Sequence, residues 1–320
     1  MPRPLMIASI GEPMIELARS ASGPVSYDRR YGGDTLNTAV YLARLLGPET
    51  ARVQYVTRLG DDPLSDWMIE GFESEGIDCS LIARVKDRRP GLYMIDTDAK
   101  GERSFSYWRG EAPARQLFEE PDLARQLDAA DAIYTSGITL AILSDQGRQR
   151  LITLMRKLKT EGRIAAFDTN YRARLWQSPK MAAPWMREAI EASTHVLPSS
   201  DDLDQIFGME DSSATWVSKL AGMGAREIVV KTGGGPVHTN VGRMDLARNA
   251  TPRDTTGAGD SFNAAYLASR LSGESIAESV DKAHRLADRV IRYPGAVIAR
   301  EAMKDLMANG HPLSSRPGQI

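Results

Sequence analysis

The stretch DTTGAGDSFN at 254–263 combines two glycines with a carboxylate at the point where a helical pattern begins. Glycines leave the backbone N–H groups unobstructed, and a helix N-terminus carries about half a positive charge. Gly257, Ala258 and Gly259 therefore form a candidate anion hole. A second interpretation stays open, in which these residues make only a tight turn and Asp260 is present because the helix dipole favours an acid there.

An anion hole followed by a carboxylate has the two parts that phosphoryl transfer to a hydroxyl requires. Backbone N–H groups hold the moving phosphoryl group, and Asp260 accepts the hydroxyl proton, a role that contributes roughly 10²–10⁴ in rate. We expect Asp260 to stay ionised at neutral pH, because the helix dipole favours its charged form. The chain has no GxxxxGK[ST] and no GxGxxG after its first strand, which excludes a P-loop enzyme and removes the main support for a dinucleotide-binding dehydrogenase.

Composition restricts the kinds of partner. The 320 residues are 42% hydrophobic and 26% charged, with a formal net charge of −2, as in soluble globular proteins and without the basic excess of nucleic-acid binders. The single cysteine, Cys79, excludes an intrachain disulfide, and four scattered histidines do not make a zinc site. No run approaches the roughly 20 apolar residues of a membrane helix. We therefore expect a cytoplasmic protein with neither a membrane nor a nucleic acid as partner.

Short β-branched segments alternate with longer helical patterns along the chain. The strand candidates are 5–11, 52–60, 132–137, 163–170, 195–199 and 226–233, and the clearest helix candidates are 35–46 and 63–76. This alternation predicts an α/β fold with a largely parallel sheet covered by helices on both faces. Ligands in such folds bind beyond the carboxyl ends of the strands.

The segment 91–110 interrupts the alternation with two strand-like runs around a turn at Asp98–Gly101, which is typical of a β-hairpin. With residues 12–32 it forms a candidate small antiparallel layer outside the main sheet. The strand period of two places Tyr107 and Arg109 on one face of this hairpin. An ordinary edge hairpin, with its aromatics packed on the core and its arginine solvated, remains the alternative.

Six stretches carry a resemblance to a known family. DTTGAGDSFNAAYLA resembles the signature of the ribokinase-like (phosphofructokinase-B type) sugar kinases, and GGDTLNTAVYLARL at 32–45 resembles their N-terminal sugar-site motif. Four more stretches narrow the resemblance to the bacterial 2-keto-3-deoxygluconate kinases: GEPMIEL at 11–17, PGLYMIDTDAKGERSFSYWR at 90–109, FDTNYRARLW at 167–176 and YPGAVIAREAM at 293–303. The matches occur in order over nearly the whole chain.

This resemblance implies a ribokinase-like three-layer fold with a single kinase domain over 1–320, into which lid segments at about 12–32 and 88–112 are inserted. It implies ATP-dependent phosphorylation of the terminal hydroxyl of 2-keto-3-deoxygluconate, with Mg²⁺ as cofactor and a monovalent cation left open. The expected partners are ATP and the small sugar acid, in a homo-oligomer of two or more subunits. The alternatives are a kinase for a neutral sugar such as fructose or ribose, and a non-catalytic sugar-binding regulatory protein.

The resemblance also implies which residues bind each ligand. Those for the sugar acid are Gly33, Asp34, Asn37, Tyr93, Tyr107, Arg109, Arg172 and Asp260. Those for ATP are Asn170, Arg172, Lys231, Thr232, Gly233, Gly235, Gly257 and Gly259, with the 275–292 helix covering adenine. An arginine at 109 suits a substrate carboxylate, because the guanidinium fork can pair with it through two hydrogen bonds. Helix capping by Asp34 or Thr35 is a further role for their segment.

Two features depart from the family pattern. Family members use an Asn-x-x-Glu motif to organise the magnesium shell, whereas PSSDD at 198–202 places Ser199 and Asp202 in those positions. Nucleotide phosphates still require a cation to offset their charge, and we expect Asp202 to bind it through water. The segment 235–254 is short for the family and lacks part of the usual hairpin before the signature.

Overall fold

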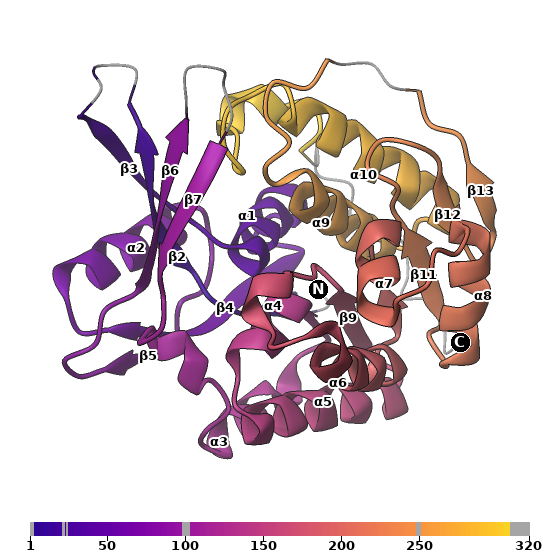
Figure 1. Ribbon diagram of the computed structural model, residues 1–320, viewed down its shortest axis with the longest axis horizontal. Helices are drawn as coiled ribbons and strands as arrows, with labels where there is room; N and C mark the ends of the chain where they lie inside the picture. Colours follow the sequence, from indigo (N-terminus) through magenta and orange to yellow (C-terminus); the bar gives the residue numbers. More distant parts are fainter. Residues whose placement is uncertain (1–2, 21–22, 24, 98–102, 248–250, 308–320) are drawn as a thin grey trace.

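The large sheet is built from nine strands within the part of the chain that the structure, a computed structural model, describes: residues 3–20, 23, 25–97, 103–247 and 251–307 (Figure 1). The strands are β1 (Leu5–Ile10), β4 (Ala51–Gly60), β5 (Ile82–Val85), β8 (Ala132–Ser136), β9 (Ile164–Asp168), β10 (His195–Val196), β11 (Glu227–Val230), β12 (Val237–Thr239) and β13 (Gly242–Met244). Their order is β13-β12-β11-β10-β9-β8-β1-β4-β5. All pairs from β11 to β5 are parallel, and β12 and β13 add an antiparallel edge.

Helices cover both faces of this sheet, as the alternation of segments predicts. One face carries α1 (Asp34–Leu46), α2 (Pro63–Ser74), α9 (Ala258–Leu271) and α10 (Ile276–Val290); the other carries α3 (Asp122–Gln126), α4 (Gly137–Ile142), α5 (Asp145–Thr160), α6 (Pro179–Ala192), α7 (Ser200–Phe207) and α8 (Ser213–Gly222). Four 3-10 turns, η1 (Pro113–Gln116), η2 (Leu127–Ala129), η3 (Ala173–Leu175) and η4 (Arg300–Met303), complete the described elements.

Neighbouring residues of the central strands pack into opposite cores. In β8, Ile133 lies in the core with α5 and α6, whereas Tyr134 lies in the core with α1 and α9. In β9, Phe167 and Ala166 divide in the same way, because successive side chains of a strand point to opposite faces. Figure 1 shows α5 and α6 on one side of the sheet and α9 and α10 on the other. The predicted three-layer α/β fold is confirmed.

A second sheet of four strands stands beside the first, at the left of Figure 1. Its strands are β2 (Met14–Arg19), β3 (Tyr27–Gly32), β6 (Gly91–Thr97) and β7 (Arg103–Trp108), in the order β3-β2-β6-β7. We call this sheet the lid. The pairs β2–β3 and β6–β7 are antiparallel hairpins as predicted, but β2 and β6 pair in parallel, because no turn joins these two strands and constrains their direction. The expected turn at Asp98–Gly101 lies outside the described residues.

Two further expectations concern the hairpin before the signature and the helix over 275–292. The segment before the signature does contain a hairpin, although β12 and β13 are only three residues each. The helix expected over 275–292 is α10, with a capping box formed by Ser275 and Glu278. None of the helices in the described ranges is long and apolar enough to cross a membrane.

Candidate active site

A cavity of about 980 Å³ opens between the lid, the carboxyl ends of the central strands and the beginning of α9. Every residue that the sequence analysis assigned to the site lines this cavity: Gly33, Asp34, Asn37, Tyr93, Tyr107, Arg109, Asn170, Arg172, Asp202, Lys231, Thr232, Gly233, Gly235, Gly257, Ala258, Gly259 and Asp260. These residues come from segments more than 200 positions apart in the chain. The parallel topology brings them to one edge of the sheet, where ligands of such folds bind.

The loop that begins α9 offers two free backbone donors. Gly257 has a φ of 76° and precedes the helix, and a Cβ there would lie 2.5 Å from the carbonyl oxygen of Ala296. Ala258 donates its N–H to Thr255 at 3.2 Å, whereas within the described chain the N–H groups of Gly257 and Gly259 have no hydrogen-bond partner. The candidate donors of the anion hole are therefore the N–H groups of Gly257 and Gly259, without that of Ala258.

Asp254 holds this loop in place from its other end. Its carboxylate accepts hydrogen bonds from the backbone N–H and hydroxyl of Thr256, at 3.0 and 2.7 Å, and from the N–H of Gly295 at 2.7 Å. Asp254 is buried. A charge-assisted network of this kind fixes the loop before any ligand arrives.

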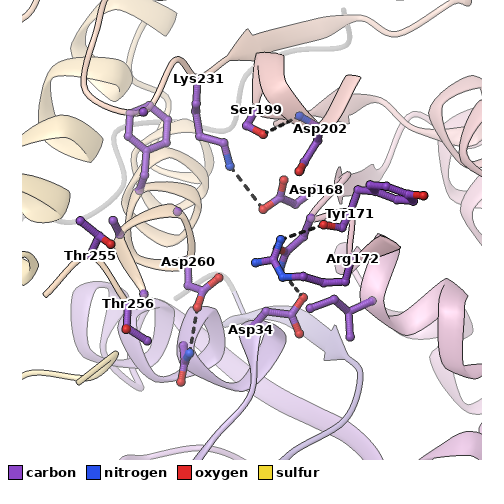
Figure 2. Close-up of a pocket in the computed structure, with 18 of the residues that line it drawn as sticks. Asp34, Asp168, Tyr171, Arg172, Ser199, Asp202, Lys231, Thr255, Thr256 and Asp260 are labelled. Carbon is purple, nitrogen blue, oxygen red and sulfur yellow. Dashed lines mark hydrogen bonds and ion pairs between the residues drawn. The ribbon is translucent and has the colours of Figure 1, made fainter. Parts of the chain in front are cut away.

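Asp260 faces the cavity from the first turn of α9 (Figure 2). Its Oδ2 accepts a hydrogen bond of 2.8 Å from the side-chain amide of Asn37. Burial, and then the negative charge of Asp34, raise the pKa of Asp260 to about 8, with Asp168 adding to the effect and Lys231 opposing it. The expectation that the helix dipole keeps this group ionised is wrong, because desolvation and two neighbouring acids outweigh the dipole.

Asp34 does not cap its helix. Gly33 precedes α1, and no side chain of the described chain accepts the first N–H groups of the helix. The carboxylate of Asp34 instead accepts a 2.8 Å hydrogen bond from the side chain of Asn170, while Thr35 bonds to the buried hydroxyl of Tyr55. Asn170 has a φ of 29°, and such a strained backbone often marks a functional position.

A buried polar network lies behind Asp260, and most of its members were not among the site residues predicted from the sequence. Lys231 contacts the carboxylate of Asp168 at 3.3 Å and the amide oxygen of Asn263 at 2.9 Å. Asn263 in turn donates to Asp168 at 2.7 Å and to Tyr134 at 3.0 Å. A Cβ on Gly259 would lie 3.8 Å from the Lys231 ammonium. This network therefore holds a positive charge beside the anion hole.

The lid contributes an aromatic row to the cavity. Tyr93 and Tyr107 are paired residues of β6 and β7, and their rings are stacked with centroids 5.7 Å apart. Phe105 continues the row at 6.3 Å from Tyr107. The hydroxyl of Tyr93 donates to Glu16 on β2. Glu16 was missed, because the pairing of β2 with β6 that brings it to Tyr93 is not visible in the sequence.

Arg109 reaches the cavity, but its guanidinium group is already paired. The side chain is 9% exposed and forms an ion pair with Glu12, which is 1% exposed. Burial raises the pKa of Glu12, and the charge of Arg109 opposes that shift. The Nε of Arg109 is buried and, among the described residues, has no hydrogen-bond partner. Glu12 was missed as a site residue, although it stands in the GEPMIEL stretch that carries part of the resemblance.

Acids that could serve a magnesium ion lie on the opposite side from the lid. Asp202 accepts a 2.9 Å hydrogen bond from Thr169, and Ser199 caps α7 by accepting from the N–H of Asp202. Burial and the charge of Asp168 raise the pKa of Asp202. No cluster of three or more His, Cys, Asp or Glu side chains suited to a metal occurs among the described residues. The donor set thus fits an ion bound mainly by phosphate and water, not an all-protein cage.

The remaining wall of the cavity is glycine-rich and only partly apolar, and α10 contributes both Ala287 and the polar residues His284 and Asp288. Ile291 also lines the cavity. The glycine loop 233–235 closes the same end, where Thr232 donates to the carbonyl of Pro236 at 2.8 Å. This end of the cavity suits a flat, partly apolar group.

The family model for pfkB family carbohydrate kinases matches residues 5–303 of the chain. The chain belongs to this family. The kinase is 40% identical to 2-dehydro-3-deoxygluconokinase of Escherichia coli K12 over 307 residues, which cover 93% of this chain and 98% of that protein. It is 35% identical to the enzyme of the same name from Haemophilus influenzae over 311 residues, 94% and 98% of the two chains. A fructokinase of Klebsiella pneumoniae is 29% identical over 244 residues, 74% and 76% of the two chains.

Solved structures place the kinase in the ribokinase-like fold. The crystal structure of 2-dehydro-3-deoxygluconokinase from Thermotoga maritima matches with a TM-score of 0.81, 22% identity and coverage of 94% of this chain and 99% of that one. A putative ribokinase II of E. coli, in complex with ATP and Mg²⁺, matches with a TM-score of 0.79, 18% identity and coverage of 95% and 98%. The predicted fold family is confirmed.

Proposed function

We propose that this kinase transfers the γ-phosphoryl group of ATP to the terminal (6-) hydroxyl of 2-keto-3-deoxy-D-gluconate, also called 2-dehydro-3-deoxygluconate, giving 2-keto-3-deoxy-6-phosphogluconate. The position of Asp260 carries the proposal. Its carboxylate is bonded to Asn37 of the sugar-site segment and lies one residue from the free N–H of Gly259. The names and near-complete coverage of the E. coli and Haemophilus relatives support the choice of substrate.

In this mechanism Asp260 accepts the proton of the 6-hydroxyl group while the oxygen of that hydroxyl group forms a bond to the γ-phosphorus of ATP. The bond from that phosphorus to the bridging oxygen breaks, ADP leaves, and Asp260 later releases the proton to water. The N–H groups of Gly257 and Gly259 donate to the oxygens of the transferred group, and Lys231 adds positive charge beside them. The raised pKa of Asp260 suits this role, since a general base works best when its pKa is near the working pH.

Substrate and nucleotide occupy the two ends of the cavity in this proposal. The sugar acid lies under the lid, between Asp34, Asn37 and the stacked Tyr93 and Tyr107, with Arg109 at its carboxylate end. The phosphates of ATP lie between the sugar and Lys231, with Asn170 and Arg172 beside them, and its adenine lies against α10, next to Thr232, Gly233 and Gly235.

Mg²⁺ would offset the charge of the ATP phosphates. We assign Asp202 to hold it through water, with Asp168 next to it. Burial, and then the charge of Asp168, act against ionisation of Asp202 and raise its pKa, and a divalent cation would offset both effects. A monovalent cation is a further candidate activator, and titration of the activity with potassium and sodium salts tests it.

A coupled assay for ADP release tests the proposed function. We expect kcat/KM for 2-keto-3-deoxygluconate to exceed that for fructose, ribose and gluconate by at least roughly 10²-fold, since a site built to pair with polar substrate groups strongly rejects analogues without them. A preference for fructose or ribose would favour the neutral-sugar alternative, which the weaker fructokinase match supports less. Absence of turnover with every sugar would favour the non-catalytic alternative.

The setting of the enzyme belongs to the same proposal. A substrate pair of ATP and a free sugar acid suits the cytoplasm, which fractionation of the source cells would test. We also propose a homo-oligomer of two or more subunits, as expected from the resemblance to sugar kinases. Sedimentation equilibrium of the purified chain, with an expected mass of at least twice the 35.1 kDa of one chain, tests the oligomer.

A further inference from the structure

Arg174 connects the body of the kinase to the lid across the mouth of the cavity. It lies in η3, the next element after β9, and its guanidinium carbon is 3.8 Å from the ring centroid of Tyr107 on β7. Both residues line the cavity. Tyr107 is at the same time stacked on Tyr93 and Phe105. Arg174 therefore places a cation over the middle ring of the aromatic row of the lid.

The charge of Arg174 is uncompensated, unlike that of Arg109. Arg174 is exposed and, within the described parts of the chain, makes no ion pair and donates no hydrogen bond. Arg109 shares its charge with Glu12. Arg172 acts on Asp202, where its charge opposes the rise in the pKa of that acid, and its Nη1 donates to the carbonyl of Tyr171. Of these three arginines of the cavity wall, Arg174 is thus the one that brings a free positive charge to the lid side.

An anionic substrate needs such a charge, because the cavity is rich in acids. Asp34 and Asp168 line it together with Asp202 and Asp260, whose pKa values burial raises, and the field of the ionised carboxylates opposes the entry of a further carboxylate. A guanidinium that stacks with its face on an aromatic ring keeps its edge free for a carboxylate. The stacking on Tyr107 also fixes the group before the substrate arrives, which lowers the entropy cost of binding.

We propose that Arg174 is the residue that selects an acidic sugar: it stacks on Tyr107 and, held in that position, pairs with the substrate carboxylate. This inference rests on the proposed function. The carboxylate is at the opposite end of the substrate from the reacting 6-hydroxyl, so the contact is equally strong in the ground state and the transition state. Arg174 therefore lowers KM for the acid and leaves kcat nearly unchanged.

The test compares Arg174→Met, Arg174→Lys and the matched control Arg187→Met. Arg187 is also an arginine stacked over an aromatic ring, 5.4 Å from the centroid of Phe207, but it does not line the cavity. The substrates are 2-keto-3-deoxygluconate and its neutral analogue with the carboxylate reduced to an alcohol. Thermal unfolding verifies that each variant folds as the wild type does.

We expect Arg174→Met to raise KM for the acid by roughly tenfold or more, as for a lost charge-assisted hydrogen bond, with kcat within about twofold. Arg174→Lys recovers part of this loss, and neither change alters KM for the neutral analogue. Arg187→Met leaves both substrates unaffected. An unchanged KM for the acid, or equal losses on both substrates, overturns the inference while the proposed function stands. A wild type that prefers fructose overturns both.

Discussion

The side-chain amide of Asn37 donates a hydrogen bond of 2.8 Å to the carboxylate of Asp260 across 223 residues of chain. Asn37 belongs to α1, whose N-terminal segment is assigned to the sugar, and Asp260 belongs to α9, whose N-terminus presents the anion hole. The two helices pack side by side on one face of the sheet (Figure 1). In the proposed mechanism, this packing sets the distance between the sugar hydroxyl and the phosphoryl group.

Replacing the proposed base is the most direct test of the mechanism. Asp260→Asn retains the shape of the side chain and an oxygen that can accept from Asn37, but it cannot take the proton. We expect kcat to fall by at least roughly 10²-fold, with little change in ATP affinity measured by calorimetry. Turnover near that of the wild type would remove Asp260 from the role of base.

The same substitution, Asp260→Asn, should lower activity but raise the stability of the folded protein at higher pH. The folded-state pKa of Asp260 is raised, so its contribution to stability is present at low pH and is lost as pH rises through that pKa. An asparagine in its place does not titrate and carries no such penalty. The unfolding temperature of Asp260→Asn relative to the wild type should therefore increase between about pH 5 and pH 8 by differential scanning calorimetry, and a constant difference would contradict the raised pKa.

The charge of Asp34 should affect the pH dependence of kcat/KM. Only the ionised carboxylate of Asp260 accepts a proton, so kcat/KM falls toward acid pH through the pKa of the free enzyme. Asp34→Asn removes a charge that raises this pKa, and the acid limb should move to lower pH. Asp201→Asn, which changes an exposed acid at the start of α7, is the matched control and should leave the limb in place. A common limb for all three proteins would show that Asp34 does not tune the base.

The two glycines of the anion hole should respond differently to alanine. At Gly257 a methyl group meets the backbone of Ala296 and the φ of 76° is unfavourable, so Gly257→Ala should lower the unfolding temperature. At Gly259 the φ is ordinary and the nearest atom is the Lys231 ammonium at 3.8 Å. Gly259→Ala should therefore fold at least as stably as the wild type while kcat falls by roughly 10²-fold, because the methyl group occupies the phosphoryl site. A stable, fully active Gly259→Ala protein would leave the anion hole without support.

The sequence was sufficient to predict which residues line the cavity that we propose as the active site. Two glycines at a helix start predicted the site of Asp260, and the strand period of two predicted that Tyr107 faces the same cavity as Arg109. Both inferences are local, because they depend on spacing within a single element. The largely parallel sheet with helices on both faces followed from the alternation of elements, and the lid from the hairpin pattern and the family resemblance, whereas the order of the strands was not predicted.

The protonation of Asp260 and the charge pairing of Arg109 could not be predicted in the same way. The pKa of Asp260 depends on Asp34 and Asp168, which reach it from two other segments. The partner of Arg109 is Glu12, brought there by the pairing of β2 with β6. Charge compensation of this kind is a property of the assembled fold, so helix and strand patterns carry no sign of it.

The ion pair of Arg109 with Glu12 changes the effect to be expected from Arg109. Since Glu12 already neutralises the guanidinium group, Arg109 should contribute only an ordinary hydrogen bond to the binding of a substrate carboxylate. This is about 0.5–1.5 kcal/mol or roughly 2–10-fold in KM. Arg109→Met alone leaves Glu12 buried without its counter-charge, which should lower stability by about 3–5 kcal/mol. Adding Glu12→Gln removes that buried charge and should restore most of the stability in urea unfolding, without restoring KM for 2-keto-3-deoxygluconate. If the double variant regains both the stability and the KM of the wild type, Arg109 serves only to hold the lid. If the KM of the double variant for the acid rises by far more than tenfold while KM for a neutral analogue is unaffected, Arg109 retains a usable charge in spite of Glu12.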